Sequence, residues 1–202
     1  MIKNKFLLLG VLLIFLGIVI TAIPFINNIK IKEEAKKQVE EFINDINTEN
    51  NTEIVQETLK EPNSTSYTEK YIMALEIPKI RLKKGIYSKD SKYNSVKYGI
   101  QIMMESNLPD DLYGNLILAS HSGSSNISYF DALDKLTIGD EVYIYYQDNK
   151  YIYSISNVYE KEKNGEIKII RDKSQTTISL ITCKKNTKDK QLIYIGNLIG
   201  VT

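Results

Sequence analysis

Residues 176–185 read T-T-I-S-L-I-T-C-K-K and contain Cys183, the only cysteine among the 202 residues. Seven residues of strand-forming character come before this cysteine, and they predict a strand over 176–183 that carries one thiol at its end. A lone cysteine excludes an internal disulfide, so the thiol stays free.

The only histidine, His121, closes a second apolar run, N-L-I-L-A-S-H-S-G at 115–123, which predicts a strand over 116–120. One cysteine and one histidine, each at the end of an apolar strand, are what a thiolate–imidazole site requires. A free thiol has a pKa near ~8.5 and needs a partner that favours the thiolate. On residue types alone, the alternative is that Cys183 is a buried packing residue and His121 a surface loop residue.

The rest of the chain from residue 70 has the pattern of a β protein. A short helix is expected from Ser128, as its cap, to Leu136, with Asp131 in its first turn. Several short strands with few helices favour a closed or nearly closed barrel. The further strands are expected at 71–77, ended by Pro78, at 85–88, at 141–146 and 151–159 as a hairpin across 148–150, and at 191–201, with a helical turn at 90–96.

The N-terminal part predicts a membrane anchor. Residues 6–26 carry no charged side chain, and about 20 apolar residues in a helix span a bilayer. The run is longer than the core of a cleaved signal peptide, and no clear small-residue cleavage site follows it. We therefore predict an uncleaved transmembrane signal anchor.

Residues 27–69 are expected to connect this anchor to the β domain. The stretch 47–69 is rich in Asn, Thr, Glu and Ser, which is typical of a linker. Residues 29–46 predict an amphipathic stalk helix that lies on the domain, with a regulatory or partner-binding segment as the alternative. The apolar stripe of this helix consists of Ala35, Val39, Phe42, Ile43 and Ile46.

Several stretches resemble, in order and spacing, the sortases, which are membrane-anchored cysteine transpeptidases of Gram-positive bacteria. They are L-E-I-P-K-I at 75–80, L-I-L-A-S-H-S-G at 116–123, Y-F-D-A-L-D-K-L-T-I-G-D-E-V-Y at 129–143, I-S-L-I-T-C at 178–183 and the final strand after the cysteine. The resemblance covers about 71–202. It implies a mainly β fold, the closed eight-stranded sortase barrel with short helices, as a catalytic domain at 70–202. It also implies the orientation of the anchor, with this domain outside the cell and residues 1–5 in the cytoplasm.

The resemblance also implies an activity. Sortases attack the threonine carbonyl of an L-P-x-T-G-like sorting signal, and an amine of a peptidoglycan precursor or of a pilin then resolves the acyl-enzyme. The nucleophile carries over to Cys183 and the acid/base role to His121, since both lie in matching motifs. The alternatives are a catalytically weak sortase-fold module that binds sorting-signal peptides, and a cysteine hydrolase that cleaves without transfer.

The third residue of the family pattern is missing. Sortases place an arginine on the strand after the cysteine, and alignment on 192–198 puts Gln191 there. The two arginines of the chain, Arg81 and Arg171, lie in other elements. We expect the Gln191 amide to donate to the developing oxyanion, with Lys188 or Lys190 supplying charge from the loop.

Three residues that flank the expected pair are assigned to substrate binding. Ser122 follows His121, and Thr182 and Lys184 flank Cys183. The backbone N–H of Lys184 is expected to be the first donor to the oxyanion, because it follows the nucleophile directly.

The charge balance of the chain bears on a nucleic-acid partner, and one acidic stretch bears on a metal ion. With 26 basic and 25 acidic residues, the net charge of +1 does not suggest a nucleic-acid partner.

Glu160, Glu162 and Glu166 belong to a lysine-rich stretch that, by the resemblance, borders the substrate groove. We interpret them as a solvated face and expect no cofactor. A calcium ion, which some sortases bind nearby, is the alternative.

Overall fold

The computed structural model describes residues 33, 36–44, 71–123, 125, 127–165 and 167–202. Val39–Thr202 form one compact unit and Met1–Gln38 another. The predicted anchor at 6–26 and the linker at 47–69 lie outside the described residues. In the part of the chain that the structure describes, no helix is long and apolar enough to cross a bilayer.

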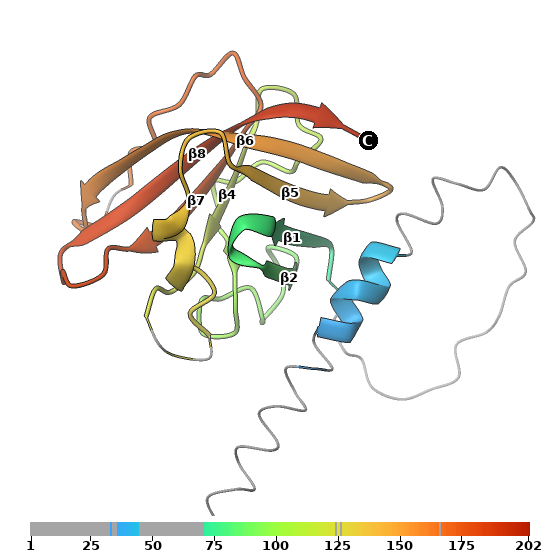
Figure 1. Ribbon diagram of the computed structural model, residues 1–202, viewed down its shortest axis with the longest axis horizontal. Helices are drawn as coiled ribbons and strands as arrows, with labels where there is room; N and C mark the ends of the chain where they lie inside the picture. The colour runs from blue at the N-terminus through green and yellow to red at the C-terminus, as the bar shows by residue number, and fades with distance from the viewer. Residues whose placement is uncertain (1–32, 34–35, 45–70, 124, 126, 166) are drawn as a thin grey trace, which may run out of the picture. The chain divides into compact units, whose positions relative to one another are not determined.

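Eight strands form one sheet in the order β2-β1-β5-β6-β8-β7-β4-β3, which curls into a barrel (Figure 1). Neighbouring strands are antiparallel except β4 and β7, which run parallel. Because β2 and β3 remain as edges, the barrel is nearly closed and not fully closed as expected. The strands span Met73–Ile77 (β1), Leu82–Ile86 (β2), Gln101–Ile102 (β3), Asn115–Ala119 (β4), Glu141–Tyr146 (β5), Asn149–Glu162 (β6), Thr177–Cys183 (β7) and Lys190–Val201 (β8).

The sequence prediction was wrong for the region between β1 and β4. A short 3₁₀ helix, η1 (Pro78–Ile80), ends at Arg81 in a left-handed conformation with φ 53°, so β2 begins at once and not at residue 85. The expected helical turn at 90–96 is a series of turns. There the Asn94 side chain accepts from the Ile102 N–H at 2.7 Å and donates to the Ile102 carbonyl at 3.0 Å, and thereby replaces a strand partner.

The expected helix at 128–136 is the 3₁₀ helix η2 (Asp131–Lys135), and its cap differs from the prediction. The N-cap residue is Phe130, and no side chain caps the helix. The Ser128 hydroxyl instead bonds the Ser125 hydroxyl at 2.8 Å, within the loop that leads from β4.

Residues 36–44 are helical, as the apolar stripe indicated. Within the unit that begins at Val39, the side chains of Val39 and Ile43 are buried with Ala74 of β1 and Tyr145 of β5. Two further members of the predicted stripe, at 35 and 46, lie outside the described residues.

The two faces of β7 contribute to different apolar layers, since side chains alternate along a strand. Ile178 and Leu180 belong to the barrel interior. Ile181 belongs to a second layer on the other face, with Ile117 of β4 and Ile193 and Ile195 of β8. The half-buried side chains that pack on this second layer are Met103, Ala119, Tyr159, Ile167 and Ile169. By the same alternation, Cys183 lies on the face of Ile181, at the edge of this outer apolar layer.

Candidate active site

The parallel pairing of β4 and β7 brings the two predicted catalytic residues to one edge of the sheet. Ala119 is paired with Ile181 in this register, and His121 and Cys183 each follow two residues later. The Ser120 N–H donates to the Ile181 carbonyl at 3.2 Å, so the chains remain adjacent beyond the last pair. The His121 carbonyl accepts from the Phe130 N–H at 3.1 Å, which ties this loop to the start of η2.

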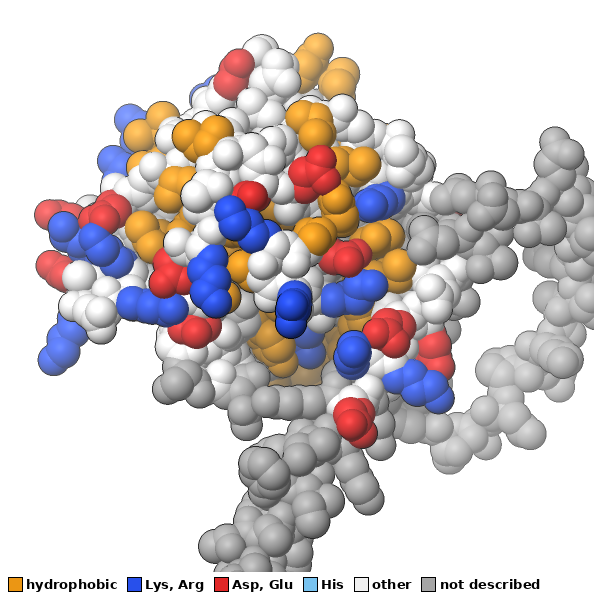
Figure 2. Space-filling view, viewed as in Figure 1, with side chains coloured by type: hydrophobic (Ala, Val, Ile, Leu, Met, Phe, Trp, Pro, Cys, Tyr) orange, Lys and Arg blue, Asp and Glu red, His pale blue; other side chains and the backbone are white. Residues whose placement is uncertain are grey.

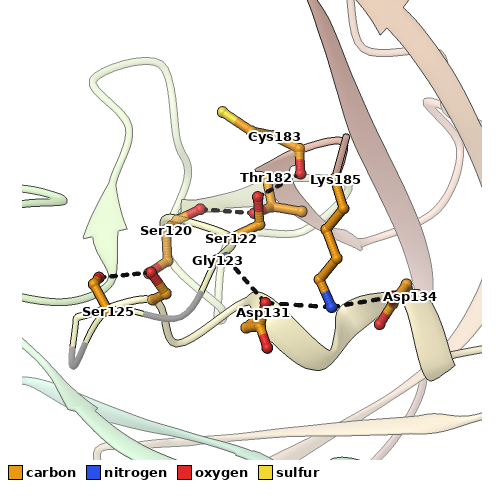
Figure 3. A network of polar contacts seen from close by, with 10 residues as sticks. Ser120, Ser122, Gly123, Ser125, Asp131, Asp134, Thr182, Cys183 and Lys185 are labelled. Carbon is orange, nitrogen blue, oxygen red and sulfur yellow. Dashed lines mark hydrogen bonds and ion pairs between the residues drawn. The ribbon is translucent and has the colours of Figure 1, made fainter. Parts of the chain in front are cut away.

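Hydroxyl groups hold the two strand ends together (Figure 3). The Ser122 hydroxyl donates to the Cys183 carbonyl at 2.7 Å, and the Thr182 hydroxyl donates to the Ser120 carbonyl at 2.9 Å. Ser122 and Thr182, both assigned to substrate binding from the sequence, therefore position the backbone around the thiol.

The sequence analysis expected the backbone N–H of Lys184 to donate to the oxyanion, but in the structure this N–H already has a partner. It donates to the Lys190 carbonyl at 2.9 Å, which continues the β7–β8 ladder one step beyond Cys183. A donor engaged in this ladder is not directed at an oxyanion. The expectation for this N–H is therefore wrong for the structure as it stands.

The thiol of Cys183 is partly exposed and has a cation beside it. In Figure 3 its sulfur points away from the hydroxyl contacts just described. The Lys163 ammonium donates to Cys183 Sγ at 3.6 Å. Lys163 directly follows β6, and the sequence analysis missed it because nothing in a lysine-rich stretch distinguishes one lysine from its neighbours.

Gln191 lies directly opposite Cys183. The two residues are paired across β7 and β8, and Gln191 is also paired with Lys161 of β6. Side chains of paired residues point to the same face, so these three share the outer face of the sheet. The Gln191 side chain is buried and makes no hydrogen bond to another described residue. Its amide is thus free for a ligand.

A pocket of about 160 Å³ is lined in part by Cys183. Ligand pockets for drug-sized molecules measure roughly 300–1,000 Å³, so this one fits only part of a peptide. Phe130 and Leu192 supply apolar wall, and Lys185 lies at its rim with Asp131 and Asp134. The lining residues are Ser122, Phe130, Asp131, Asp134, Thr182, Cys183, Lys184, Lys185 and Leu192.

Ion pairs tie the β7–β8 loop to η2 across this pocket. The Lys185 ammonium lies 3.2 Å from a carboxylate oxygen of Asp131 and 3.2 Å from one of Asp134 (Figure 3). The Gly123 N–H donates to Asp131 at 2.9 Å and, with Lys185, lowers the pKa of the Asp131 carboxyl. A lowered pKa means that the interaction is present at neutral pH and is lost as the pH falls through that pKa.

Of the three acidic residues predicted to border the substrate groove, the structure describes Glu160 and Glu162. Glu160 of β6 forms ion pairs with Lys184 and, at 3.5 Å, with Lys190, and these lysines lower the pKa of its carboxyl. Glu162 is exposed, and position 166 lies outside the described residues. In Figure 2, lysine and acidic side chains alternate at the left edge of the molecule, where Figure 1 places the end of β6 and the β7–β8 loop. Among the described residues, no three His, Cys, Asp or Glu side chains are grouped to hold a metal ion.

Neither arginine is found at the thiol. The Arg171 guanidinium donates to the carbonyls of Tyr113 at 3.0 Å, Asp172 at 3.2 Å and Gln175 at 3.0 Å. Residues 113 and 175 precede β4 and β7, so Arg171 lies at the amino ends of these strands, opposite to Cys183. Arg81 is exposed and lies between η1 and β2.

Comparison with known proteins agrees with this architecture. The model of the sortase domain family matches residues 75–199. Sortase A of Bacillus anthracis is 25% identical over 202 residues, which cover 96% of this chain and 94% of that protein. Sortase A from Corynebacterium diphtheriae, as a lid mutant, superposes with a TM-score of 0.57 at 22% identity, over 64% of this chain and 70% of that one. Sortase C1 from Streptococcus agalactiae gives a TM-score of 0.57 at 23% identity, over 66% and 69%.

The fold is therefore that of the sortase β-barrel, with a cysteine and a histidine at adjoining strand ends. Because the family model matches well over half of its length, this chain belongs to the sortase family. Sortases are cysteine transpeptidases of surface-protein anchoring, which act on sorting-signal substrates and amine acceptors.

Because Arg171 lies at the amino ends of β4 and β7, we expect its replacement to change the stability of the domain but not the reactivity of the Cys183 thiol. Arg171→Ala removes donors to three carbonyls and should lower the free energy of unfolding by about 1 kcal/mol, because these bonds are exposed. The rate at which iodoacetamide alkylates Cys183 should not change. Lys173→Ala, at an exposed neighbouring position, is the control for stability. Slower alkylation with unaltered stability in Arg171→Ala would instead place this guanidinium at the thiol.

Proposed function

We propose that this chain is a membrane-anchored transpeptidase that cleaves an L-P-x-T-G-like sorting signal through an acyl-enzyme on Cys183. It then transfers the surface protein to an amine of the cell wall or of a pilin. The observation that carries the proposal is the placement of the only cysteine and the only histidine of the chain at or just beyond the adjoining carboxyl ends of β4 and β7.

The residues at this edge suit two successive acyl transfers. The Cys183 thiolate attacks the threonine carbonyl carbon, and a C–S bond forms. When the tetrahedral intermediate collapses, the C–N bond breaks, and the departing amine takes a proton from the His121 imidazolium. The acceptor amine then attacks the thioester and gives its proton to His121, and the thiolate leaves as the new amide forms.

The surroundings of the thiol suit a mostly apolar signal. Cys183 lies at the edge of the outer apolar layer, whose half-buried members include Met103, Ala119 and Ile167. Burial of the leucine and proline side chains of a signal against such a surface is favourable. It lowers the free energy of binding by about 25 cal/mol per Å² of apolar area removed from water. The free amide of Gln191 is positioned to donate to the carbonyl oxygen under attack.

The test uses the full-length chain in detergent with an L-P-x-T-G peptide, with and without an amine acceptor. We expect release of the glycine-bearing tail, a thioester adduct on Cys183, and a transfer product when the acceptor is present, all by mass spectrometry. Cys183→Ala should give none of these, because the chain has no other thiol. Tail release without transfer would indicate a hydrolase. Binding without release would indicate a peptide-binding module, and an adduct in Cys183→Ala would exclude this nucleophile.

The membrane location is a second part of this proposal. The uncharged run at 6–26 supports a single-pass anchor with the catalytic domain outside the cell. We expect the chain to stay in the membrane fraction after carbonate washing and to lose the barrel domain when protease is added to intact protoplasts. A chain without residues 1–26 should be found in the soluble fraction. Full protection of the domain in protoplasts that keep their cytoplasmic proteins intact would reverse the predicted topology.

A further inference from the structure

Among the described residues, one cation contacts the sulfur of Cys183. The ammonium of Lys163 lies 3.6 Å from Cys183 Sγ, although 20 residues separate the two in sequence. In the sortase pattern the charged partner is an arginine at the position of Gln191, which is neutral. A neutral amide can donate a hydrogen bond, but it cannot stabilise a thiolate by charge.

The backbone of Lys163 is held in place by the sheet. The last pair of the β6–β8 ladder is Glu162 with Lys190. The Lys163 N–H then donates to the Asp189 carbonyl at 2.6 Å, which continues this ladder by one step. The Cα of Lys163 is therefore positioned by a strand pairing, and only its side chain has to reach the thiol.

The register explains why this side chain reaches Cys183. Lys161, Gln191 and Cys183 form a row across β6, β8 and β7 on one face of the sheet. Residues two apart on a strand point to the same face, so the side chain of Lys163 follows that of Lys161 on this face. It thus lies on the face of the sheet that carries the sulfur, within 3.6 Å of it.

Three neighbouring lysines are engaged in ion pairs elsewhere. Lys184 and Lys190 pair with Glu160, and Lys185 pairs with two aspartates of η2. Lys188, which the sequence analysis considered as a source of charge, is exposed and does not donate to the thiol. Among the described residues, Lys163 is the cation in contact with Cys183.

We propose that Lys163 takes the place of the missing arginine: its ammonium favours the Cys183 thiolate and then faces the charge that develops on the substrate carbonyl. This role rests on the proposed function, in which Cys183 is the nucleophile. An ammonium near a thiol favours the thiolate by charge, and thiolates beside lysine or arginine are the reactive ones. Since the chain has one cysteine, its alkylation reports this effect without any peptide.

The experiment measures the rate of iodoacetamide alkylation of the full-length chain in detergent at pH 7. Lys163→Gln should lower this rate about three- to tenfold, a small effect for a contact charge because the side chain is exposed. Lys163→Arg should keep most of the rate. Lys188→Gln, an exposed lysine of the β7–β8 loop, is the matched control and should react as the wild type does.

A rescue variant makes the assignment specific. Adding Gln191→Arg to Lys163→Gln restores a cation opposite Cys183, and it should recover the alkylation rate. A wild-type rate in Lys163→Gln, or an equal loss in Lys188→Gln, would overturn the proposal. Because alkylation requires neither sorting signal nor acceptor, a wild-type chain that fails in the peptide assay would contradict the proposed function alone.

Discussion

The parallel contact between β4 and β7 is the constraint on which this site depends. Two parallel neighbours end at the same edge of a sheet, and they need a long crossover to do so. Here η2, β5 and β6 make up that crossover, and it returns the chain so that Cys183 ends β7 beside the loop that carries His121. Strand β8 then turns back antiparallel and places Gln191 directly opposite the thiol. The β4–β7 and β7–β8 pairings together thus bring the His121 loop, Cys183 and Gln191 to one edge of the sheet.

Polar groups near the thiol divide into those that hold the backbone and those left for chemistry. The hydroxyls of Ser122 and Thr182 and the N–H of Lys184 all bond backbone carbonyls. These bonds hold the strand ends in register, and the one made by the buried Thr182 would be costly to lose, because a buried polar group is costly to leave unpaired. The thiol, the imidazole, the Gln191 amide and the Lys163 ammonium are then left to meet a substrate. A sortase with a neutral residue at position 191 can in this way keep a charge at its nucleophile.

The sequence predicted the elements better than the contacts between them. Apolar runs that end near His121 and Cys183 were enough to locate β4 and β7. Alignment on 192–198 put Gln191 at the position of the family arginine, and the structure pairs this residue with Cys183. Lys163 was not predictable, because its contact depends on the β6–β8 register, which two irregularities shift, at Ile152/Tyr153 and at Ile155/Asn157. The Lys184 N–H was misassigned because nothing in the local sequence indicates that the β7–β8 ladder continues past the nucleophile.

The central claim is that one strand pairing makes His121 and Cys183 neighbours. Since each is the only residue of its kind, the ring signal of His121 can be followed by NMR before and after the thiol is methylthiolated. The account predicts that the signal shifts when Cys183 is modified, and that the same reagent leaves it unmoved in Cys183→Ala. An unshifted His121 signal in a chain that mass spectrometry finds fully modified at Cys183 would contradict it.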